Sequence, residues 1–260
     1  MWIDIHAHLA GFPPNRLQSE LAEMQRCDVS LIINSATNLD TSREALDQAR
    51  NCERMYSTAG ISPFDVTGLE NGWPDRLAAF LNEPRVIGVG EIGIDTTNPR
   101  YPSPDLQLPV FERQLDLAAE YSLPAIIHSR GAEETAARLC EKHGVEKAVF
   151  HCFTGSDVAL RMVLDRGYYV SFSGIVTFRN ADCAGTVIAT PLNRIFIETD
   201  TPYLAPVPFR GKKNRPAWVS CTGKKVAELH GVSPEHLAAS VQDNFRRLFS
   251  VQPAPGYRNP

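Results

Sequence analysis

Short apolar runs rich in valine and isoleucine alternate along this chain with longer segments whose apolar residues recur at helical spacing. The short runs predict strands. Most are nearly continuous in apolar residues, which is typical of parallel strands that are covered on both faces. Eight strands are expected, over residues 2–6, 29–34, 55–61, 86–91, 124–128, 148–151, 168–172 and 195–198.

Helices are expected between these strands, because capping residues and helix breakers bound the intervening segments. Residues 40–42 offer caps for a helix that runs to about residue 52. Asn180 is expected to cap a helix that Pro191 stops. The other predicted helices include one with Phe111 and Leu115 on its apolar face, and cover residues 133–143, 156–167, 215–229 and 234–249.

Eight strands that alternate with helices fit either a closed barrel or an open, doubly wound sheet. No GxGxxG loop follows the first strand, which removes the commonest reason for the open sheet. A length of 260 residues is usual for a (β/α)8 barrel. We therefore expect an α/β protein with one TIM-barrel domain over residues 1–250. A loosely ordered tail with three prolines and a glycine is expected over residues 251–260.

The composition is that of an ordinary globular protein, with 43% hydrophobic and 22% charged residues. The formal net charge of −4 argues against a surface coated with basic charge for binding long duplex nucleic acid. Six cysteines occur without a CxxC pair, so we expect reduced thiols and neither a disulfide framework nor a thiolate zinc site. No signal-peptide pattern or membrane-length apolar run is present, so we expect a cytoplasmic protein without membrane contact.

Histidines and carboxylates gather at the carboxyl ends of the predicted strands. In a barrel these ends ring one mouth, where the active sites of such enzymes lie. Taken singly, each residue fits a hydrogen-bonded structural role or a helix cap. Four imidazoles and two carboxylates buried together would be costly without counter-charge, which divalent cations supply. The set is His6, His8, Glu91, His128, His151 and Asp200.

The predicted ligands are imidazoles and carboxylates with no cysteine, which suits Zn²⁺, Mn²⁺ or Mg²⁺. His6 and His8 lie two positions apart in a strand, so their side chains leave the same face. Glu91 comes from a strand between the others and is the expected bridge between two ions about 3.5–4 Å apart. We therefore predict a two-metal site at the C-terminal mouth of the barrel.

Five segments follow one another along the chain: DIHAH at 4–8, GEIGID at 90–95, IHSR at 127–130, HCFTG at 151–155 and ETDTPYL at 198–204. Together they resemble the TatD family of metal-dependent deoxyribonucleases, which belongs to the amidohydrolase-like barrels. The resemblance implies a (β/α)8 barrel with two divalent ions that hydrolyses phosphodiester bonds of DNA, typically from a 3′ end.

The resemblance also implies roles for the residues that match the motifs. His6 and His8 match the ligands on strand 1, and Glu91 matches the bridging carboxylate. His128 and His151 match the ligands of the second ion. Asp200 matches the carboxylate after strand 8, which holds metal and orients the attacking water. Glu91 and Asp200 are therefore the predicted catalytic residues.

Two segments depart from the family pattern. Relatives carry His-Pro-His after strand 3, where this chain has Ser62-Pro63-Phe64. After strand 8 relatives commonly carry His-Arg-Gly-Lys and then Asn-Glu-Pro. This chain has Phe209 in place of the histidine and Arg215 in place of the glutamate. The predicted metal ligands are thus intact, whereas the expected substrate wall is altered.

Predicted substrate contacts surround the same mouth. Basic side chains there could hold neighbouring phosphates. On charge alone, a solvated loop is the more common explanation of a basic cluster, but the position of this cluster directly after the strand-8 carboxylate favours contact with phosphate. Aromatic side chains could stack on an unpaired base or only pack against the protein. The predicted contacts are Ser62, Arg130, Phe153, Tyr203, Arg210 and Lys212, with Phe64, Lys213 and Arg215 as further candidates.

These features predict a metal-dependent 3′–5′ exodeoxyribonuclease that acts as a monomer on single-stranded DNA or frayed ends. A second hypothesis is an amidohydrolase-like hydrolase of a small molecule, because the same metal ring serves many reactions. A third is the nuclease subunit of a bacterial antiviral defence complex, because TatD-like chains also occur in such operons beside other proteins.

Overall fold

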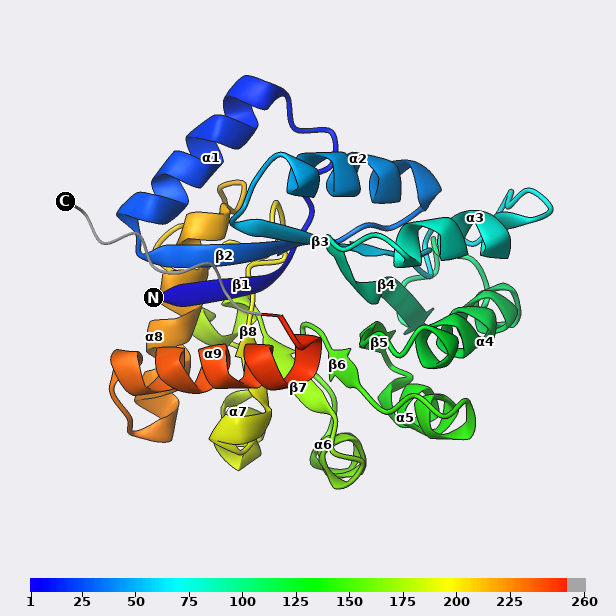
Figure 1. Ribbon diagram of the computed structural model, residues 1–260. Coiled ribbons are helices and arrows are strands. Elements are labelled where there is room, and N and C mark those ends of the chain that lie inside the picture. The colour runs from blue at the N-terminus through cyan, green and yellow to red at the C-terminus, as the bar shows by residue number, and fades with distance from the viewer. Residues whose placement is uncertain (252–260) are drawn as a thin grey trace.

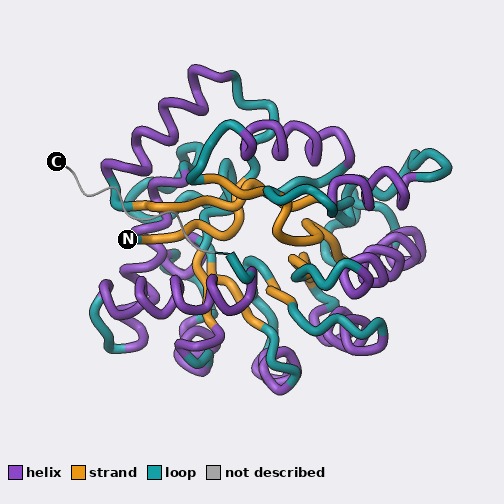
Figure 2. The backbone as a smooth tube through the Cα atoms, viewed as in Figure 1, coloured by secondary structure: helices purple, strands orange, loops and turns teal. Residues whose placement is uncertain are grey.

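The computed structural model describes residues 1–251, which form one parallel sheet of eight strands in the order β1 to β8. Helices surround the strands on the outside (Figure 1; Figure 2). The prediction of a single (β/α)8 barrel is confirmed. The strands are β1 (Trp2–Ala7), β2 (Val29–Asn34), β3 (Met55–Ala59), β4 (Val86–Asp95), β5 (Ala125–Arg130), β6 (Ala148–Phe150), β7 (Tyr169–Phe172) and β8 (Ile195–Ile197).

Strand β4 is longer than predicted and continues through Asp95. Its last residues pair with β5, with Gly93 opposite His128 and Asp95 opposite Arg130. The polar end of β4 is therefore held by backbone pairing as part of the sheet. The tail predicted over 251–260 lies outside the described residues, apart from Val251.

Most helices lie where they are predicted. Two predicted caps are wrong. Asn38 caps α2 in place of residues 40–42, because its side chain accepts the Thr41 N–H and Thr41 Oγ1 accepts the Asn38 N–H. Asn180 does not cap α7, which begins only after Cys183. The α-helices within residues 1–251 are α1 (Pro14–Arg26), α2 (Leu39–Arg50), α3 (Trp73–Leu81), α4 (Pro104–Glu120), α5 (Glu133–Lys142), α6 (Asp157–Asp165), α7 (Ala184–Ala189), α8 (Val219–His230) and α9 (Pro234–Phe249).

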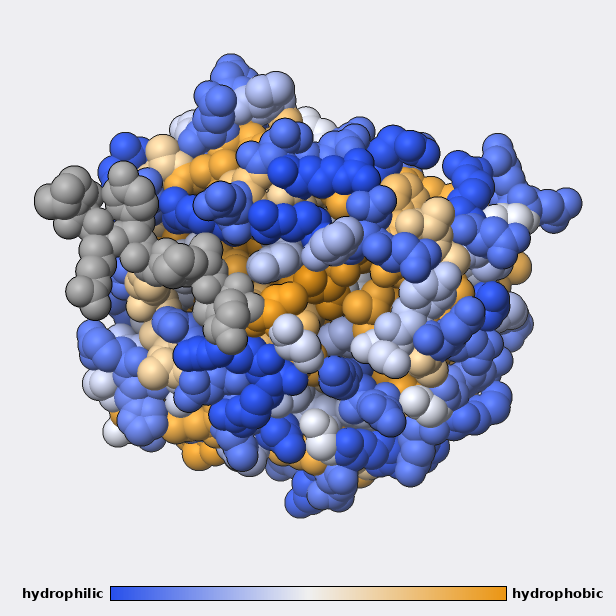
Figure 3. Space-filling view, in the orientation of Figure 1, coloured by the Kyte–Doolittle hydropathy of each residue, from blue (hydrophilic) through white to orange (hydrophobic). Residues whose placement is uncertain are grey.

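The strands form the core of the molecule. Every residue of β1, β2 and β4 is buried, which agrees with their nearly continuous apolar sequences. In Figure 3 the helices present mostly hydrophilic residues, and hydrophobic residues gather towards the centre of the view, where the strands lie. Among the described helices, none combines the length and the apolar character that crossing a membrane requires.

The barrel closes between its first and last strands at the carboxyl end. The Asp200 N–H donates to the His6 carbonyl over 2.9 Å, and the His8 N–H donates to the Thr201 carbonyl over 2.8 Å. The fully buried Asp4 carboxyl group reinforces this seam. It accepts one hydrogen bond from the N–H of Thr199 over 2.9 Å and another from the hydroxyl of Thr199 over 2.6 Å. The seam thus joins the two chain segments that carry the first and last predicted ligands.

Replacing Asp4 with alanine should destabilise the protein, because the N–H of Thr199 would then be buried without an acceptor. We expect a loss of about 3 kcal/mol, and a fall in the apparent Tm of about 10 °C in thermal unfolding followed by circular dichroism. Asp4→Asn, which keeps one carbonyl acceptor, should lose less. A Tm of Asp4→Ala within 2 °C of the unaltered protein would contradict this role of the seam.

Candidate metal centre

The barrel brings the six predicted ligands to one place at the carboxyl end of the strands. His6 and His8 come from β1 and its end, and Glu91 comes from β4. The remaining ligands come from β5 and from the residues that follow β6 and β8. These three ligands are His128, His151 and Asp200. The strands therefore bring together side chains that lie far apart in the sequence.

One group of ligand atoms gathers around Oε2 of Glu91. The Nε2 atoms of His6 and His8 lie 3.2 Å apart. They lie 3.5 Å and 3.4 Å from Oε2 of Glu91. Oδ1 of Asp200 lies 3.3 Å from Nε2 of His8 and 4.0 Å from Nε2 of His6.

A second group gathers around Oε1 of the same glutamate. This oxygen lies 2.9 Å from Nδ1 of His128 and 3.4 Å from Nε2 of His151. The two imidazole nitrogens lie 3.2 Å apart. Glu91 therefore presents one carboxylate oxygen to each group, which is the arrangement of a carboxylate that bridges two ions.

The spacing of these atoms fits divalent cations. Ligand atoms that are each about 2.1 Å from one ion lie roughly 3.0–3.4 Å from each other in tetrahedral or octahedral coordination. Most of the separations above fall in or close to this range. Two of the triads with suitable ligand atoms are His6–His8–Glu91 and Glu91–His128–His151. The residues present thus fit two cations that share Glu91.

Hydrogen bonds orient the first pair of imidazoles from behind. Nδ1 of His6 lies 3.1 Å from the hydroxyl of Ser35, and Nδ1 of His8 lies 3.0 Å from the carbonyl oxygen of the same residue. Each ring therefore turns Nε2 towards Glu91. Ser35 follows β2 and was not predicted from the sequence, because a serine after an apolar strand carries no distinctive signal.

Carboxylates orient the second pair. Nε2 of His128 lies 3.1 Å from Oδ2 of Asp95, and Nδ1 of His151 lies 3.2 Å from Oε1 of Glu198. Such outer partners fix the imidazole orientation and increase its basicity as a metal ligand. The sequence did carry a signal here, since Asp95 and Glu198 lie at strand ends within the quoted motifs. Their roles were nevertheless not predicted.

The charges of the cluster are strongly coupled. Burial acts to raise the pKa of Glu91, but the neighbouring histidines outweigh this effect and hold the pKa well below its ordinary value. Burial acts to lower the pKa of His151, but Glu198 and Glu91 raise it well above its ordinary value. Glu91 thus stays ionised, and a bound cation would take the place of the proton on His151.

Replacing Glu198 with glutamine should weaken metal binding by about 10- to 100-fold, because an amide can donate to Nδ1 of His151 and so favour the tautomer whose Nε2 carries the proton. Asp95→Asn should act in the same direction through His128. Zn²⁺ affinity measured by competition with a chromophoric chelator checks both variants. Glu228→Gln, on the exposed surface of α8, serves as the control. Unchanged affinity in both variants would show that these carboxylates do not orient the ligands.

A cavity of about 440 Å³ opens over the cluster. Five of the six predicted ligands line it, and His6 lies fully buried behind them. Of the predicted substrate contacts, Arg130 and Tyr203 line the cavity. Phe64, Thr97, Asn98 and Tyr101 add to its wall from the connections that follow β3 and β4.

Two predicted substrate contacts lie inside the protein. Phe153 is only 2% exposed and packs within the hydrophobic core, so its ring cannot stack on a ligand. The chain turns inward at this point, because Cys152 adopts a left-handed conformation and the Phe153 N–H donates to the carbonyl of Ser171. Ser62 is fully buried, and its hydroxyl has no hydrogen-bond partner among the described residues.

The basic residues after β8 do not line the cavity. The guanidinium of Arg210 lies 3.6 Å from the centre of the Phe178 ring, and the ammonium of Lys212 lies 5.8 Å from that of Phe209. Both side chains remain exposed.

Arg215 differs from these residues, because its side chain forms an ion pair with another part of the protein. Its Nε donates over 2.8 Å to Oε2 of Glu20, which is 6% exposed. The pair fastens the connection after β8 to α1. Arg215 is therefore a structural residue, and the structure does not support its predicted contact with phosphate.

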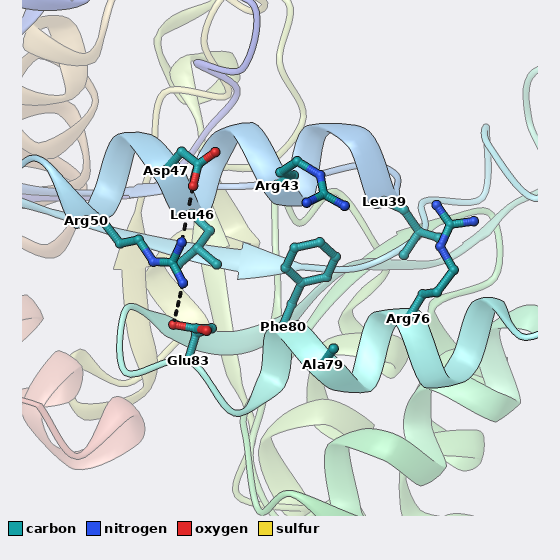
Figure 4. Close-up of a pocket in the computed structure, with 9 residues that line it drawn as sticks. All are labelled: Leu39, Arg43, Leu46, Asp47, Arg50, Arg76, Ala79, Phe80 and Glu83. Atoms are coloured by element: carbon teal, nitrogen blue, oxygen red, sulfur yellow. Dashed lines mark hydrogen bonds and ion pairs between the residues drawn. The ribbon is translucent and has the colours of Figure 1, made fainter.

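A separate hollow of about 320 Å³ lies outside the barrel between α2 and α3 (Figure 4). Leu46, Phe80 and other residues line it. Arg50 lies between Asp47 and Glu83 and pairs with both. This hollow holds no histidine or cysteine among its lining residues. Its carboxylates are already matched by arginine, so it offers none of the chemistry of the barrel mouth.

The chain matches known proteins over nearly its whole length. The family model of TatD related DNase matches residues 3–250. The chain is 34% identical to an uncharacterized metal-dependent hydrolase, YabD, from Bacillus subtilis, over 96% of this chain and 100% of that protein. It is 33% identical to the 3′-5′ ssDNA/RNA exonuclease TatD from Salmonella typhimurium, over 84% of this chain and 86% of that protein.

The solved structures include a TatD homolog from Escherichia coli, YJJV, which superposes with a TM-score of 0.90 at 28% identity. The match covers 96% of this chain and 98% of that chain. The family model covers nearly the whole chain, and the superposition with this solved structure agrees with the barrel fold. The chain therefore belongs to the TatD family of metal-dependent hydrolases.

Proposed function

We propose that this enzyme removes nucleotides from the 3′ end of single-stranded or frayed DNA, using two divalent cations. The observation that carries the proposal is the division of the ligand atoms into two groups, each around one oxygen of Glu91. Two cations about 3.5–4 Å apart are typical of enzymes that hydrolyse phosphate esters. The 3′ polarity rests on the relatives that are named 3′-5′ exonucleases.

In this proposal, His6, His8 and Asp200 hold one cation, and His128 and His151 hold the other. Glu91 would contact both. Mg²⁺, Mn²⁺ and Zn²⁺ all accept such nitrogen and oxygen ligands. When bound, the cations make water a stronger nucleophile near neutral pH and neutralise charge that develops on the phosphate.

Asp200 is the carboxylate best placed to handle the proton of the attacking water. Its side chain is 14% exposed and lines the cavity, whereas that of Glu91 is 2% exposed. Burial acts to raise the pKa of Asp200, but the hydrogen bond and charge of His8 outweigh burial and keep the pKa below its ordinary value. Asp200 would therefore be ionised, and could accept the proton or hold the water in line.

Arg130 gives the cavity a cation that suits an anionic substrate. Its guanidinium contacts Sγ of Cys152 at 3.7 Å and forms no ion pair within residues 1–251. In the proposal it holds the phosphate next to the one that is cleaved, because guanidinium groups bind phosphate oxygens well. A cavity of about 440 Å³ suits one nucleotide, whereas a duplex needs a wide, open surface.

A panel of oligonucleotides labelled at the 5′ end tests the proposal after chelation of the protein and addition of Mg²⁺, Mn²⁺ or Zn²⁺. We expect single-stranded DNA to be shortened one nucleotide at a time from the 3′ end, blunt duplex to be cut more slowly, and chelation to stop both reactions. A 3′ phosphorothioate should slow the first step. Metal-restored protein that leaves every oligonucleotide intact would exclude a nuclease function.

A hydrolase of a small molecule is the second candidate. The observation that favours it is the half-buried Phe64, which lines the cavity where family relatives carry histidine. It predicts turnover of a small ester or amide, and none of DNA.

We take the working form as a cytoplasmic monomer. Co-purification with proteins from neighbouring genes would favour the defence-complex hypothesis instead.

A further inference from the structure

Two aromatic rings form one wall of the cavity above the metal ligands. Phe64, from the connection after β3, and Tyr101, from the connection after β4, have ring centres 4.4 Å apart. Phe64 also meets the ring of His128 nearly at right angles, with centres 4.9 Å apart. Both aromatic residues line the cavity and are half-buried. We call this pair the aromatic wall.

Buried glutamines of α4 hold both connections in place. Oε1 of Gln114 accepts the Ile61 N–H at 2.7 Å, and its Nε2 donates to the Ile61 carbonyl at 2.9 Å. Oε1 of Gln107 accepts the Asp95 N–H at 2.8 Å, and its Nε2 donates to the Asp95 carbonyl at 2.9 Å and to that of Pro102. Each glutamine thus fastens the backbone close to one ring of the aromatic wall.

The two glutamines lie seven residues apart, which is about two helical turns and places them on the same side of α4. Both are fully buried. Helix α4 therefore sets the positions of Phe64 and Tyr101 together before any ligand binds. A rigid aromatic surface of this kind loses little conformational freedom when a ligand stacks on it.

We infer that the aromatic wall stacks on the base of the nucleotide whose phosphate lies over the metal ligands, so that only an unpaired terminal nucleotide is accepted. This inference rests on the proposed nuclease function and names the part of the site that selects its substrate. Phe64 offers no hydrogen bond and Tyr101 offers a single hydroxyl, so the wall does not distinguish one base from another. Stacking on such surfaces is tolerant of sequence, because every base has a π face.

A 3′-terminal 2-aminopurine reports stacking through quenching of its fluorescence. The probe is an oligonucleotide with this base and a phosphorothioate at the last linkage, mixed with the Mg²⁺-loaded protein. The variants are Phe64→Leu, Tyr101→Leu and the double variant, which keep an apolar side chain at each position but remove the rings. Phe80→Leu, in the separate hollow between α2 and α3, is the matched control. Thermal unfolding verifies that each variant is folded.

The expected result is quenching by the unaltered protein and by Phe80→Leu, and loss of most of it in the double variant. Probe affinity should fall by about 5- to 50-fold with the rings removed. An oligonucleotide whose terminal residue lacks a base should bind all variants alike. Equal quenching in every variant, or none in the unaltered protein, would overturn the inference.

Hydrolysis of an unmodified strand by the unaltered protein is measured separately and tests the proposed function itself. Quenching without hydrolysis would support the aromatic wall and refute the nuclease. Hydrolysis with equal rates in the double variant and in Phe80→Leu would support the nuclease and refute the wall.

Discussion

Replacing Glu91 with glutamine is expected to lower kcat on a single-stranded oligonucleotide by at least about 10³-fold, because metal-ion charge stabilisation contributes several kcal/mol and each 1.4 kcal/mol is a factor of ten. Both carboxylate oxygens of Glu91 face imidazole nitrogens, at 2.9 Å from His128 and 3.4 Å from His8. Glutamine keeps the shape of the side chain but replaces one oxygen with an amide nitrogen, which is not a metal ligand. The variant should therefore lose the shared ligand.

Elemental analysis of purified protein checks the cause of this loss. We expect fewer metal ions per chain in Glu91→Gln than in Glu235→Gln, whose altered side chain is exposed on α9. Circular dichroism should show that the variant remains folded. A variant that keeps both its metal content and its activity would remove Glu91 from the centre of the mechanism.

Asp200→Asn is expected to lower kcat by about 10²- to 10⁴-fold, the usual contribution of a general base, with a smaller change in KM. Asparagine can still accept hydrogen bonds and coordinate through its carbonyl oxygen, but it cannot take a proton from water. Single-turnover kinetics with excess enzyme measure the chemical step directly. Asp105→Asn, an exposed change in the first turn of α4, provides the matched control.

A second outcome separates the two possible roles of Asp200. If it mainly holds a cation, excess Mn²⁺ should restore most of the activity of Asp200→Asn. If it mainly handles the proton, activity should stay low at every metal concentration. Wild-type single-turnover rates in the variant would contradict both roles.

The barrel could be predicted from the sequence because parallel strands covered on both faces are apolar along nearly their whole length. Such runs are visible without knowledge of the fold, as in β2 and β8. The ends of strands are harder to predict than their positions. β4 continues through Asp95 because its polar end pairs with β5, which the sequence of β4 alone does not indicate.

The ligand set was visible because its members stand at strand ends, and a barrel brings these ends to one mouth. The partners behind the ligands were less visible. Ser35 is recognisable only once the fold places it against His6 and His8. Asp95 and Glu198 lay within recognised motifs, but their roles depend on which imidazole nitrogen each one faces.

The substrate wall was the part least accessible to prediction. Connections after strands take their shape from contacts with distant segments. Arg215 pairs with Glu20 across most of the chain, and Phe153 turns into the core after a left-handed residue. Residue type alone could not distinguish these side chains from Arg130, which does reach the cavity.

The hydrogen bonds between Asp200 and His6, and between His8 and Thr201, have a consequence for the synthesis of the protein. The ribosome makes the two histidines before the other four predicted ligands, and it makes Asp200 last of the six. A nascent polypeptide that ends before Asp200 lacks one of the six predicted ligands and the backbone contacts that join it to β1. The set of predicted ligands is therefore complete only after translation has passed β8.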